Sequence, residues 1–488
     1  MTSPVVAGSG LGYELLWTTP QQVGTNAVAH ALGRVFVASG TSLAELDMQT
    51  GAPLNQIAID TNRFSAITSV AAFGSLVAIS LRSTDPTARG AVQLYNASST
   101  SPALNLSAEM AVGVGPDMLT FTRDGARILV ANEGEPVCTA DGQYVDPEGS
   151  ISVIDTASHL VQPVTFEAFN GRAPELIRNG VRIFGPGATV AQDVEPEHIA
   201  VGAFGHVAWV TLQENNAIAI VDLVRNPPAV AAIVPLGVKD HGLPENALDV
   251  SDKDGPGGTA LPGNIQPHPN LYGMYLPDGI DTGIINGATY LFTANEGDAR
   301  DYSPCFSEEK RASELSLALA SFPPDQVAAL QRLRVTTTLG ALGGTFTHLY
   351  SFGARSFAIW NPRGEMVFES GKLIETVLAT EFPEYLRDDR SDDKGPEPED
   401  LVFGRVASHP FLFVGLERAN GVMAFDVRQP THPTFAAFLP NPPDAAFPAG
   451  ENPERLDFVP AQASVTSRPL LLVTNEVSGR LRAFELHD

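Results

Sequence analysis

Short apolar runs, separated by turns rich in Gly and Pro, follow one another along most of the chain. Such runs are typical of β-strands that are buried on at least one face. They return in similar groups at a period of roughly 40 residues, which indicates a repeat architecture. The pattern therefore predicts an all-β protein built from repeated units.

Five of the units open with a proline and an acidic residue, followed by an apolar strand. These openings are PDMLTF at 116, PEHIAV at 196, PDGIDT at 277, PEDLVF at 398 and PERLDF at 453. After a short turn, each unit continues into a second apolar strand that ends in Glu. Those strands are RILVANE, AWVTLQE, YLFTANE, FLFVGLE and LLLVTNE. A third strand follows in every unit, and most units have a fourth.

Residues 26–112 contain two more four-strand units that lack the acidic signature, so the chain holds seven units. Four short antiparallel strands per unit are typical of propeller blades. We predict one seven-bladed β-propeller domain over residues 1–488, with four-stranded antiparallel blades as in YVTN and WD40 propellers. The blades are expected at residues 26–60, 67–112, 116–169, 195–238, 277–370, 397–440 and 452–487. The alternative, two or three stacked β-sandwiches, does not predict the recurring Pro-acid start.

The last unit has three strands of its own, and residues 13–19 (YELLWTT) are the candidate for its missing outer strand. This closure would leave no open sheet edge at the seam. Three insertions interrupt the units, at residues 157–194, 239–276 and 303–346, and we expect them on one face. Helical spacing predicts short helices in the first and third insertions. The helical stretches are APELIRNG, SEEKRASELSLALA and PDQVAALQRL.

The chain is strongly acidic. With 30 Lys plus Arg against 56 Asp plus Glu, its formal net charge is −26. That charge repels nucleic acid and anionic membranes and suits cations or simple solubility. No apolar run is long enough to span a membrane, and the start of the chain lacks the basic and apolar regions of a secretory signal. We therefore expect no nucleic-acid partner and no transmembrane segment.

In a propeller blade, the start of the first strand and the end of the second lie on the same rim, because the two strands are antiparallel. The recurring acids should therefore meet in pairs around one mouth of the central channel. The expected pairs are Asp117 with Glu133, Glu197 with Gln213, Asp278 with Glu296, Glu399 with Glu417, and Glu454 with Glu476. These pairs gather nine carboxylates at one rim.

A cation would neutralise this rim, because carboxylates held close together raise one another's pKa and destabilise the fold. Calcium accepts about six to eight oxygen ligands from carboxylates, carbonyls and amides, and magnesium or manganese are alternatives. The expected ligands are Asp117, Asn132, Glu133, Glu197, Asp278, Asn295, Glu296, Glu399, Glu417 and Glu476, with a further amide at Asn475. The competing interpretation is that each acid caps its own turn and that Asn merely suits the turn dihedrals.

Basic residues recur beside the acidic motifs, at Arg300, Arg355 and Lys394. A carboxylate-held metal with such anion-binding cations nearby would suit a phosphate ester, although the cations could equally neutralise neighbouring acids. The chain has no HExxH, GxSxG or P-loop motif, so catalysis would need a metal-activated water, and whether the protein is an enzyme stays open. A separate stretch, DVSDKDG at 249–255, resembles part of a calcium loop but lacks the distal Glu of an EF-hand.

Several stretches resemble the choice-of-anchor I family, which includes mesenchyme-specific cell-surface glycoproteins and bacterial alkaline-phosphatase-like proteins. They include PDMLTFTRDGARILVANEGEP, VRIFGPGATVAQDVEPEHIAV, YLFTANEGDARDY, RSDDKGPEPE and LLLVTNEVSG. The resemblance implies an extracellular propeller, secreted or displayed at a cell surface, that binds cations or mineral. In the last blade NPERLDF stands where the family has a Pro-Glu-Gly start, so Glu454 is left out of the expected ligands.

Cys138 and Cys305 follow the two ANEG motifs. For the secreted chain that the resemblance implies, we expect them to form a disulfide across the face that carries the site, and two unrelated buried thiols are the alternative. The sequence thus leads to a secreted or surface-displayed calcium-binding propeller that acts as a matrix- or mineral-associated binding module, with a protein or glycan as a further candidate partner. The alternative function is a metal-dependent phosphoric-ester hydrolase, similar to alkaline phosphatases or phytases, that uses the same rim.

Overall fold

Seven four-stranded antiparallel sheets form the main body of the described chain. The structure, a computed structural model, describes residues 10–21, 25–98, 101–442, 444–447 and 449–488. The first nine residues, where the sequence shows no secretory signal, lie outside this range. In six of the seven sheets the strands follow one another in chain order, each hydrogen-bonded to the one before it.

The first four sheets cover the chain as far as residue 235. The first consists of β2 (Thr25–Ala31), β3 (Arg34–Ser39), β4 (Ser42–Asp47) and β5 (Pro53–Ala58). The second consists of β6 (Phe64–Phe73), β7 (Leu76–Ser83), β8 (Arg89–Ser98) and β9 (Ser101–Val114). The third consists of β10 (Pro116–Phe121), β11 (Arg127–Asn132), β14 (Ser150–Asp155) and β15 (Val161–Thr165). The fourth consists of β16 (Pro196–Val201), β17 (Val207–Leu212), β18 (Ala217–Asp222) and β19 (Ala229–Pro235).

The remaining three sheets use the rest of the chain and its N-terminal strand. The fifth consists of β22 (Ile280–Ile285), β23 (Ala288–Asn295), β31 (Ser356–Trp360) and β32 (Met366–Glu369). The sixth consists of β33 (Pro398–Val406), β34 (His409–Leu416), β35 (Gly421–Asp426) and β36 (Thr434–Pro440). The seventh consists of β37 (Pro453–Val459), β38 (Leu470–Asn475), β39 (Arg480–His487) and β1 (Gly12–Thr18).

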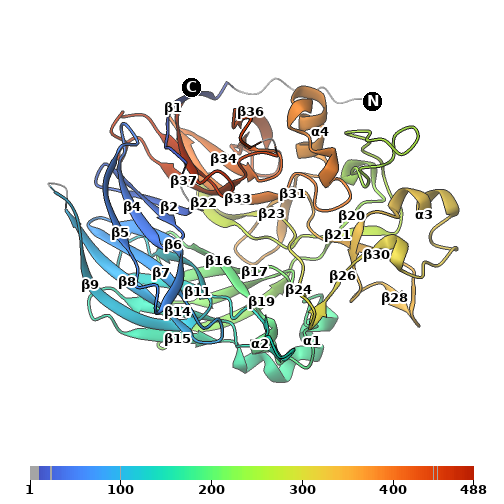
Figure 1. Ribbon diagram of the computed structural model, residues 1–488, viewed down its shortest axis with the longest axis horizontal. Coiled ribbons are helices and arrows are strands. Elements are labelled where there is room, and N and C mark those ends of the chain that lie inside the picture. Colours follow the sequence, from blue (N-terminus) through green and yellow to red (C-terminus); the bar gives the residue numbers. More distant parts are fainter. Residues whose placement is uncertain (1–9, 22–24, 99–100, 443, 448) are drawn as a thin grey trace.

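The first strand of each sheet lies next to the first strand of the following sheet, and the ring is closed. The neighbouring pairs are β2 with β6, β6 with β10, β10 with β16, β16 with β22, β22 with β33, β33 with β37, and β37 with β2. Within the second sheet, β6, β7, β8 and β9 follow one another outward from this ring (Figure 1). The prediction of an all-β propeller is confirmed, and the inner strands surround a central channel.

The N-terminal strand β1 joins the last sheet to the first. It pairs antiparallel with β39, with Gly12 opposite His487 and Trp17 opposite Ala483. The indole of Trp17 is buried among apolar residues of both the first and the last sheets, and its Nε1 donates a hydrogen bond to the Met48 carbonyl at 3.0 Å. The β1 strand therefore completes the last sheet and links both ends of the ring.

The insertions carry their own secondary structure outside the ring. A five-stranded sheet, on the right in Figure 1, contains β20 (Val238–Asp240), β21 (Leu271–Met274), β30 (Leu349–Ser351), β27 (Arg334–Thr336) and β26 (Glu309–Arg311). Two-stranded hairpins are β12 (Val137–Cys138) with β13 (Tyr144–Val145), β24 (Asp301–Tyr302) with β25 (Phe306–Ser307), and β28 (Ala341–Leu342) with β29 (Thr345–Phe346). The α-helices are α1 (Ala173–Asn179), α2 (Val190–Asp193), α3 (Pro324–Leu330) and α4 (Leu373–Glu381). The 3-10 turns are η1 (Glu167–Arg172), η2 (Pro244–Asn246), η3 (Ala312–Glu314), η4 (Pro383–Tyr385) and η5 (Asp388–Arg390).

One of the predicted helices is wrong. The stretch SEEKRASELSLALA, at residues 307–320, contains β26 and the single turn η3 instead of an α-helix. Leu317 forms a parallel bridge with Phe346, and it packs with Leu315 on a buried cluster that includes Leu330. Leucine at every second position, as in Leu315, Leu317 and Leu319, is compatible with an extended chain as well as with a helix. Packing against the surrounding core therefore determines that this segment is extended. Helices α1 and α3 occur in the other two predicted helical stretches, whereas α2 and α4 were not predicted.

Replacing the anchor of β1 should weaken the closure of the ring. The Trp17→Ala variant removes a large side chain that is 9% exposed, so we expect a loss of unfolding free energy of about 3–5 kcal/mol. Chemical denaturation measures this loss. The matched control is Leu15→Ala in the same strand, whose side chain is 38% exposed and should cost about 0.5 kcal/mol or less. Equal effects of the two variants would contradict the role assigned to Trp17.

Candidate functional site

In four of the five units that open with proline and an acid, the acidic residue lies in a β-bulge, whereas Asp278 precedes its strand β22, which has no bulge. In four sheets the residue opposite the proline is the last residue of the second strand, and the inner strand then carries one residue more than its partner. A bulge turns a side chain away from its regular direction in the sheet. The four bulges begin at Pro116, Pro196, Pro398 and Pro453. The Pro-acid motif thus has a local structural reason, because the bulge directs the acid to the channel mouth.

At this mouth the channel opens into a cavity of about 460 Å³ that is lined almost entirely by charged side chains, which we call the acidic cavity. All nine carboxylates expected at the rim line it, together with Gln213. Four further carboxylates, which the sequence did not single out, bring the number to thirteen: Glu135, Glu214, Asp298 and Asp301. Four cationic side chains also line it: Arg82, Lys394, Arg418 and Arg455.

Asp117, Glu133 and Glu197 form the first group whose oxygen atoms lie within 4.8 Å of one another, the first triad. They come from β10, from the residue after β11, and from β16, so two neighbouring sheets contribute. The cation beside them is Arg82, whose Nη2 lies 3.1 Å from Glu133. In the described part of the chain, Asp117 and Glu197 make no ion pair. Burial, together with the neighbouring carboxylates, raises the pKa of all three.

A second triad, Glu296, Glu397 and Glu417, meets the same distance limit but is surrounded by cations. Lys394 Nζ lies 2.6 Å from Glu296 and 3.7 Å from Glu397. Arg418 binds Glu417 at 2.8 Å and Glu397 at 3.1 Å. Arg390 also binds Glu397, at 2.6 Å. The protein's own cations therefore neutralise this group. Glu397 was not predicted, whereas the predicted Glu399 lines the cavity outside the triad.

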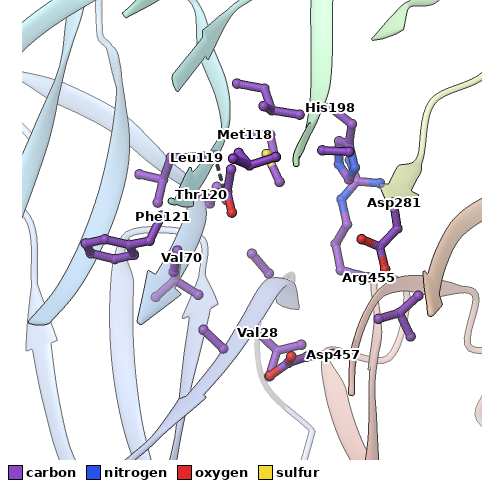
Figure 2. A pocket seen from close by; sticks show the side chains of 18 of the residues that line it. Val28, Val70, Met118, Leu119, Thr120, Phe121, His198, Asp281, Arg455 and Asp457 are labelled. Carbon is purple, nitrogen blue, oxygen red and sulfur yellow. Dashed lines mark hydrogen bonds between the residues drawn. The ribbon is translucent and has the colours of Figure 1, made fainter. Parts of the chain in front are cut away.

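Arg455 lies where the acidic cavity meets the rest of the channel. Its Nη1 is 2.6 Å from Asp278 and 3.7 Å from Glu399, and it lines both the acidic cavity and a second cavity on the opposite side. Figure 2 shows this second cavity, with apolar side chains such as Phe121 on one side and His198 and Arg455 on the other. Burial lowers the pKa of His198 to about 3, so its imidazole is neutral near pH 7.

Three asparagines, each directly before a glutamate of the rim, lie inside their sheets and not in the acidic cavity. They are Asn132, Asn295 and Asn475. The Nδ2 of Asn132 lies 3.1 Å from the Ser152 hydroxyl, and its Oδ1 accepts the backbone N–H of Gly113 at 3.0 Å. Asn295 donates to the Ser356 hydroxyl at 3.1 Å. Asn475 accepts a hydrogen bond from Asn441 at 2.5 Å and, like the other two, is fully buried. Their amides are committed to neighbouring strands and loops, so the structure does not bring them to the carboxylates as the sequence analysis expected.

Two of the three expected anion-binding cations are also elsewhere. Arg300 is 1% exposed and pairs with Asp193 at 3.2 Å and Glu195 at 2.6 Å. Arg355 is 3% exposed and binds Glu375 at 2.9 Å and several backbone carbonyls. Their contacts are local ion pairs and hydrogen bonds, and neither lines the acidic cavity. Lys394 alone of the three lies there.

Cys138 and Cys305 form a disulfide whose Cα atoms are 5.6 Å apart. It joins the β12–β13 hairpin, after the third sheet's second strand, to the segment between β24 and β25. Tyr302, beside Cys305, lines the acidic cavity and donates a hydrogen bond from its hydroxyl to Glu195 at 2.7 Å. The disulfide therefore ties together two loops that form one wall of the cavity.

Removing the Asn132 amide should affect stability and not cation binding. The Asn132→Ala variant leaves the half-buried Gly113 N–H without its acceptor and removes the hydrogen bonds of a buried amide, which costs about 1–3 kcal/mol of unfolding free energy. Chemical denaturation and calcium titration calorimetry measure the two effects. Asn62→Ala, at an exposed turn, serves as the control with little expected change. A loss of calcium affinity without a loss of stability would instead make Asn132 a ligand.

The chelated protein should become less stable as the pH rises. Burial raises the pKa of Glu417 and Glu454 from 4.5 to about 8, so the folded state keeps protons that the unfolded state releases. The stabilisation from these groups is complete below pH 4.5 and is lost as the pH rises to about 8. Melting curves across this range should show a falling melting temperature, with a shallower fall in Glu454→Gln. A melting temperature that rises through this window in both proteins would contradict this assignment.

The comparisons with known proteins agree with the fold. Gigasin-3a of Magallana gigas is 27% identical over 185 residues, covering 33% of this chain and 65% of the relative. The mesenchyme-specific cell surface glycoprotein of Strongylocentrotus purpuratus is 26% identical over 329 residues, covering 56% of this chain and 41% of the relative. The chain thus spans less than two thirds of the length of either relative. The crystal structure of RRP9 WD40 repeats, at 9% identity, has a TM-score of 0.50 over 99% of this chain and 98% of that chain, which supports the fold alone.

None of the helices in the described residues combines the length and apolar character needed to cross a bilayer. The family assignment rests on a match that is much longer than either pairwise alignment. Because the sequence model of the choice-of-anchor I domain matches residues 25–430, which is most of the chain, this protein belongs to the choice-of-anchor I domain family.

Proposed function

We propose that this protein binds a divalent cation, calcium in particular, at the first triad of Asp117, Glu133 and Glu197. The observation that carries the proposal is the approach of three carboxylates to within 4.8 Å of one another with Arg82 as the one cation paired to them in the described chain. Three like charges at this distance repel one another strongly when the surroundings are shielded from water. A bound cation would remove this repulsion.

The chemistry of the triad suits a hard cation. Calcium prefers carboxylate and other oxygen ligands, and it completes its shell with water where the protein offers too few. Glu214, which also lines the acidic cavity, has one buried oxygen without a hydrogen-bond partner in the described structure. Its charge is among the causes that raise the pKa of Glu197, so it adds negative charge beside the first triad. With no Cys or His side chain lining the cavity, the softer ligands that zinc favours are missing from the described lining.

The second triad is a less suitable cation site than the first, because it is already surrounded by positively charged side chains. Lys394 and Arg418 already occupy the space around Glu296, Glu397 and Glu417 as fixed positive charges. A divalent cation would have to displace an ammonium or guanidinium group there, whereas the first triad is ion-paired with one guanidinium in the described chain, that of Arg82, and the charge of Arg455 acts on Asp117 without an ion pair. We therefore assign one cation to the acidic cavity, at the first triad.

The cation-bound cavity would serve a binding module that acts outside the cell or at its surface, associated with a matrix or mineral. One relative is named a cell surface glycoprotein, which supports this location. The net charge of −26 and thirteen carboxylates at one cavity suit a partner that presents cations, such as a calcium mineral, or one that shares a protein-bound cation. The phosphoric-ester alternative has no such support, because Arg300 and Arg355 are engaged in local ion pairs away from the cavity.

Neutralising two ligands of the first triad should abolish tight cation binding. We expect Glu133→Gln/Glu197→Gln to bind calcium at least ~10-fold more weakly than the wild type, which corresponds to about 1.4 kcal/mol or more. Calorimetric titration of chelator-treated protein measures the affinity, and plasma mass spectrometry of the purified protein measures bound calcium.

The matched control is Glu296→Gln/Glu417→Gln, which makes the same change in charge within the same cavity. Its calcium affinity should change less, because the second triad is already neutralised by Lys394 and Arg418. Equal losses in both double variants would indicate a general effect of charge. Unchanged affinity in Glu133→Gln/Glu197→Gln would overturn the proposed site.

A further inference from the structure

The loop at residues 249–264 and the turn at residues 387–393 come from distant parts of the sequence and lie against each other. Arg332 holds them together, because its Nη2 binds Asp252 of the loop at 2.9 Å and Asp392 of the turn at 3.2 Å. Its Nε also binds Asp252. One guanidinium therefore bridges two carboxylates, one from each segment.

Other contacts fix the same two segments. Arg355 donates one hydrogen bond to the Asp249 carbonyl at 2.6 Å and another to the Ser391 carbonyl at 2.7 Å. Gly263, at the end of the loop, is so close to the segment before the turn that an added Cβ would lie 3.4 Å from the Leu386 side chain. The seam between loop and turn is therefore a defined part of the structure.

Asp388 is the most unusual group in this seam. The residue is 8% exposed, and both of its carboxylate oxygens are buried without a hydrogen-bond partner in the described structure. The backbone N–H of Leu261 lies near it but does not meet hydrogen-bonding geometry. A buried carboxylate without partners is strongly unfavourable, and buried charges in proteins are paired or coordinate metals.

Asp254 also has a buried carboxylate oxygen without a hydrogen-bond partner in the described structure. Its Oδ2 accepts a hydrogen bond from the Asn264 amide at 2.7 Å, but its Oδ1 is buried and has no partner in the described structure. Arg332 brings the two segments together through Asp252 and Asp392. Across this seam the charges of Asp254 and Asp252 act on Asp388, whose pKa burial and these charges raise to about 6. On the Asp254 side lies His268, whose Nε2 is also buried without a partner.

The neighbouring cations are already engaged with other carboxylates. Arg332 binds Asp252 and Asp392, and Lys253 lies 3.3 Å from Asp252. In the same turn, Arg387 pairs with Asp389 and Arg390 with Glu397. In the described structure, then, no cationic side chain pairs with Asp254 or Asp388.

We propose that the seam between residues 249–264 and 387–393 is a second cation site, distinct from the acidic cavity, that binds calcium through the carboxylates of Asp254 and Asp388. Oxygen ligands from two carboxylates, completed by backbone carbonyls and water, suit calcium. The Asp-rich stretch at 249–255 lacks the distal Glu of a calcium loop, and Asp388 supplies the missing carboxylate from another part of the chain. The cation would join loop and turn together with Arg332 and Arg355.

Asp388→Asn and Asp389→Asn test the site as a matched pair. Both change one charge in the same turn, but the Asp389 side chain is 63% exposed and pairs with Arg387 at 2.6 Å. Each is made in the Glu133→Gln/Glu197→Gln background, so that the first triad does not contribute. Melting curves of chelated protein, with and without added calcium chloride, are combined with hydrogen-exchange mass spectrometry.

We expect calcium to raise the melting temperature and to slow exchange in residues 249–264 and 387–393 of the background protein and of Asp389→Asn. In Asp388→Asn both responses should be lost, with calcium binding at least ~10-fold weaker. Without calcium, Asp388→Asn should melt at or above the temperature of the background protein, because the substitution removes a buried unpaired charge. Asp254→Asn should repeat the loss and provides the same test if Asp388→Asn does not fold.

Equal calcium responses in Asp388→Asn and Asp389→Asn would overturn the proposal, as would a background protein with no response to calcium. Protection by zinc but not by calcium, abolished in His268→Gln, would overturn the assignment to a hard cation. The outcome is independent of the acidic cavity, since loss of binding at the first triad leaves the protection of residues 249–264 unchanged.

Discussion

Closure of the seven inner strands into a ring is the constraint on which the rest of the structure depends. A Pro-acid start and a Glu at the end of the next strand would be harmless in a single sheet, where each acid could face water. The ring points the same ends of the sheets at one axis, so the repeated motif places nine carboxylates around one cavity, and four more from neighbouring positions bring the number to thirteen. The electrostatic cost of this arrangement is a consequence of repetition, and the fold has to offset it.

The cationic side chains that neutralise the rim carboxylates are unevenly distributed around the ring. The side of the fifth and sixth sheets receives Lys394 and a neighbouring arginine from the segment that joins these sheets, and Arg418 from the sixth sheet. Arg455 reaches Asp278 near the axis. On the side of the third and fourth sheets, Arg82 from the neighbouring second sheet is the one cation ion-paired with the first triad in the described chain, and the charge of Arg455 also acts on Asp117. The cations that pair directly with the rim carboxylates are therefore concentrated on one side, and the other side is where we propose a bound cation.

Much of this plan could be predicted from the sequence, because the strand period and the antiparallel order of strands follow from the repeat alone. The strand bounds lie close to the expected blades, and the nine rim carboxylates share one cavity for the same reason. The orientation of the asparagines could not be predicted, because a side chain at the end of a strand can point into the channel or toward the neighbouring strand. For Asn132, hydrogen bonds to Ser150 and Ser152 hold the side chain against the adjacent strand. Glu397 and Arg82 follow no repeat, since Glu397 comes from the segment that joins the fifth and sixth sheets and Arg82 from a sheet without the acidic motif.

The segment that no repeat predicts also connects the proposed cation site in the seam with the second triad of the acidic cavity. Asp388 lies at its start, in the seam with the loop at 249–264, and Lys394 and Glu397 lie at its end, in the second triad. Between them, Arg390 binds Glu397, while the Ser391 and Asp393 carbonyls accept hydrogen bonds from Arg355. Few backbone dihedrals separate the two ends, so a cation that fixes Asp388 would also fix the position of Lys394. The side of the cavity that is neutralised by protein cations would then depend on calcium as well, through the order of the segment that carries them.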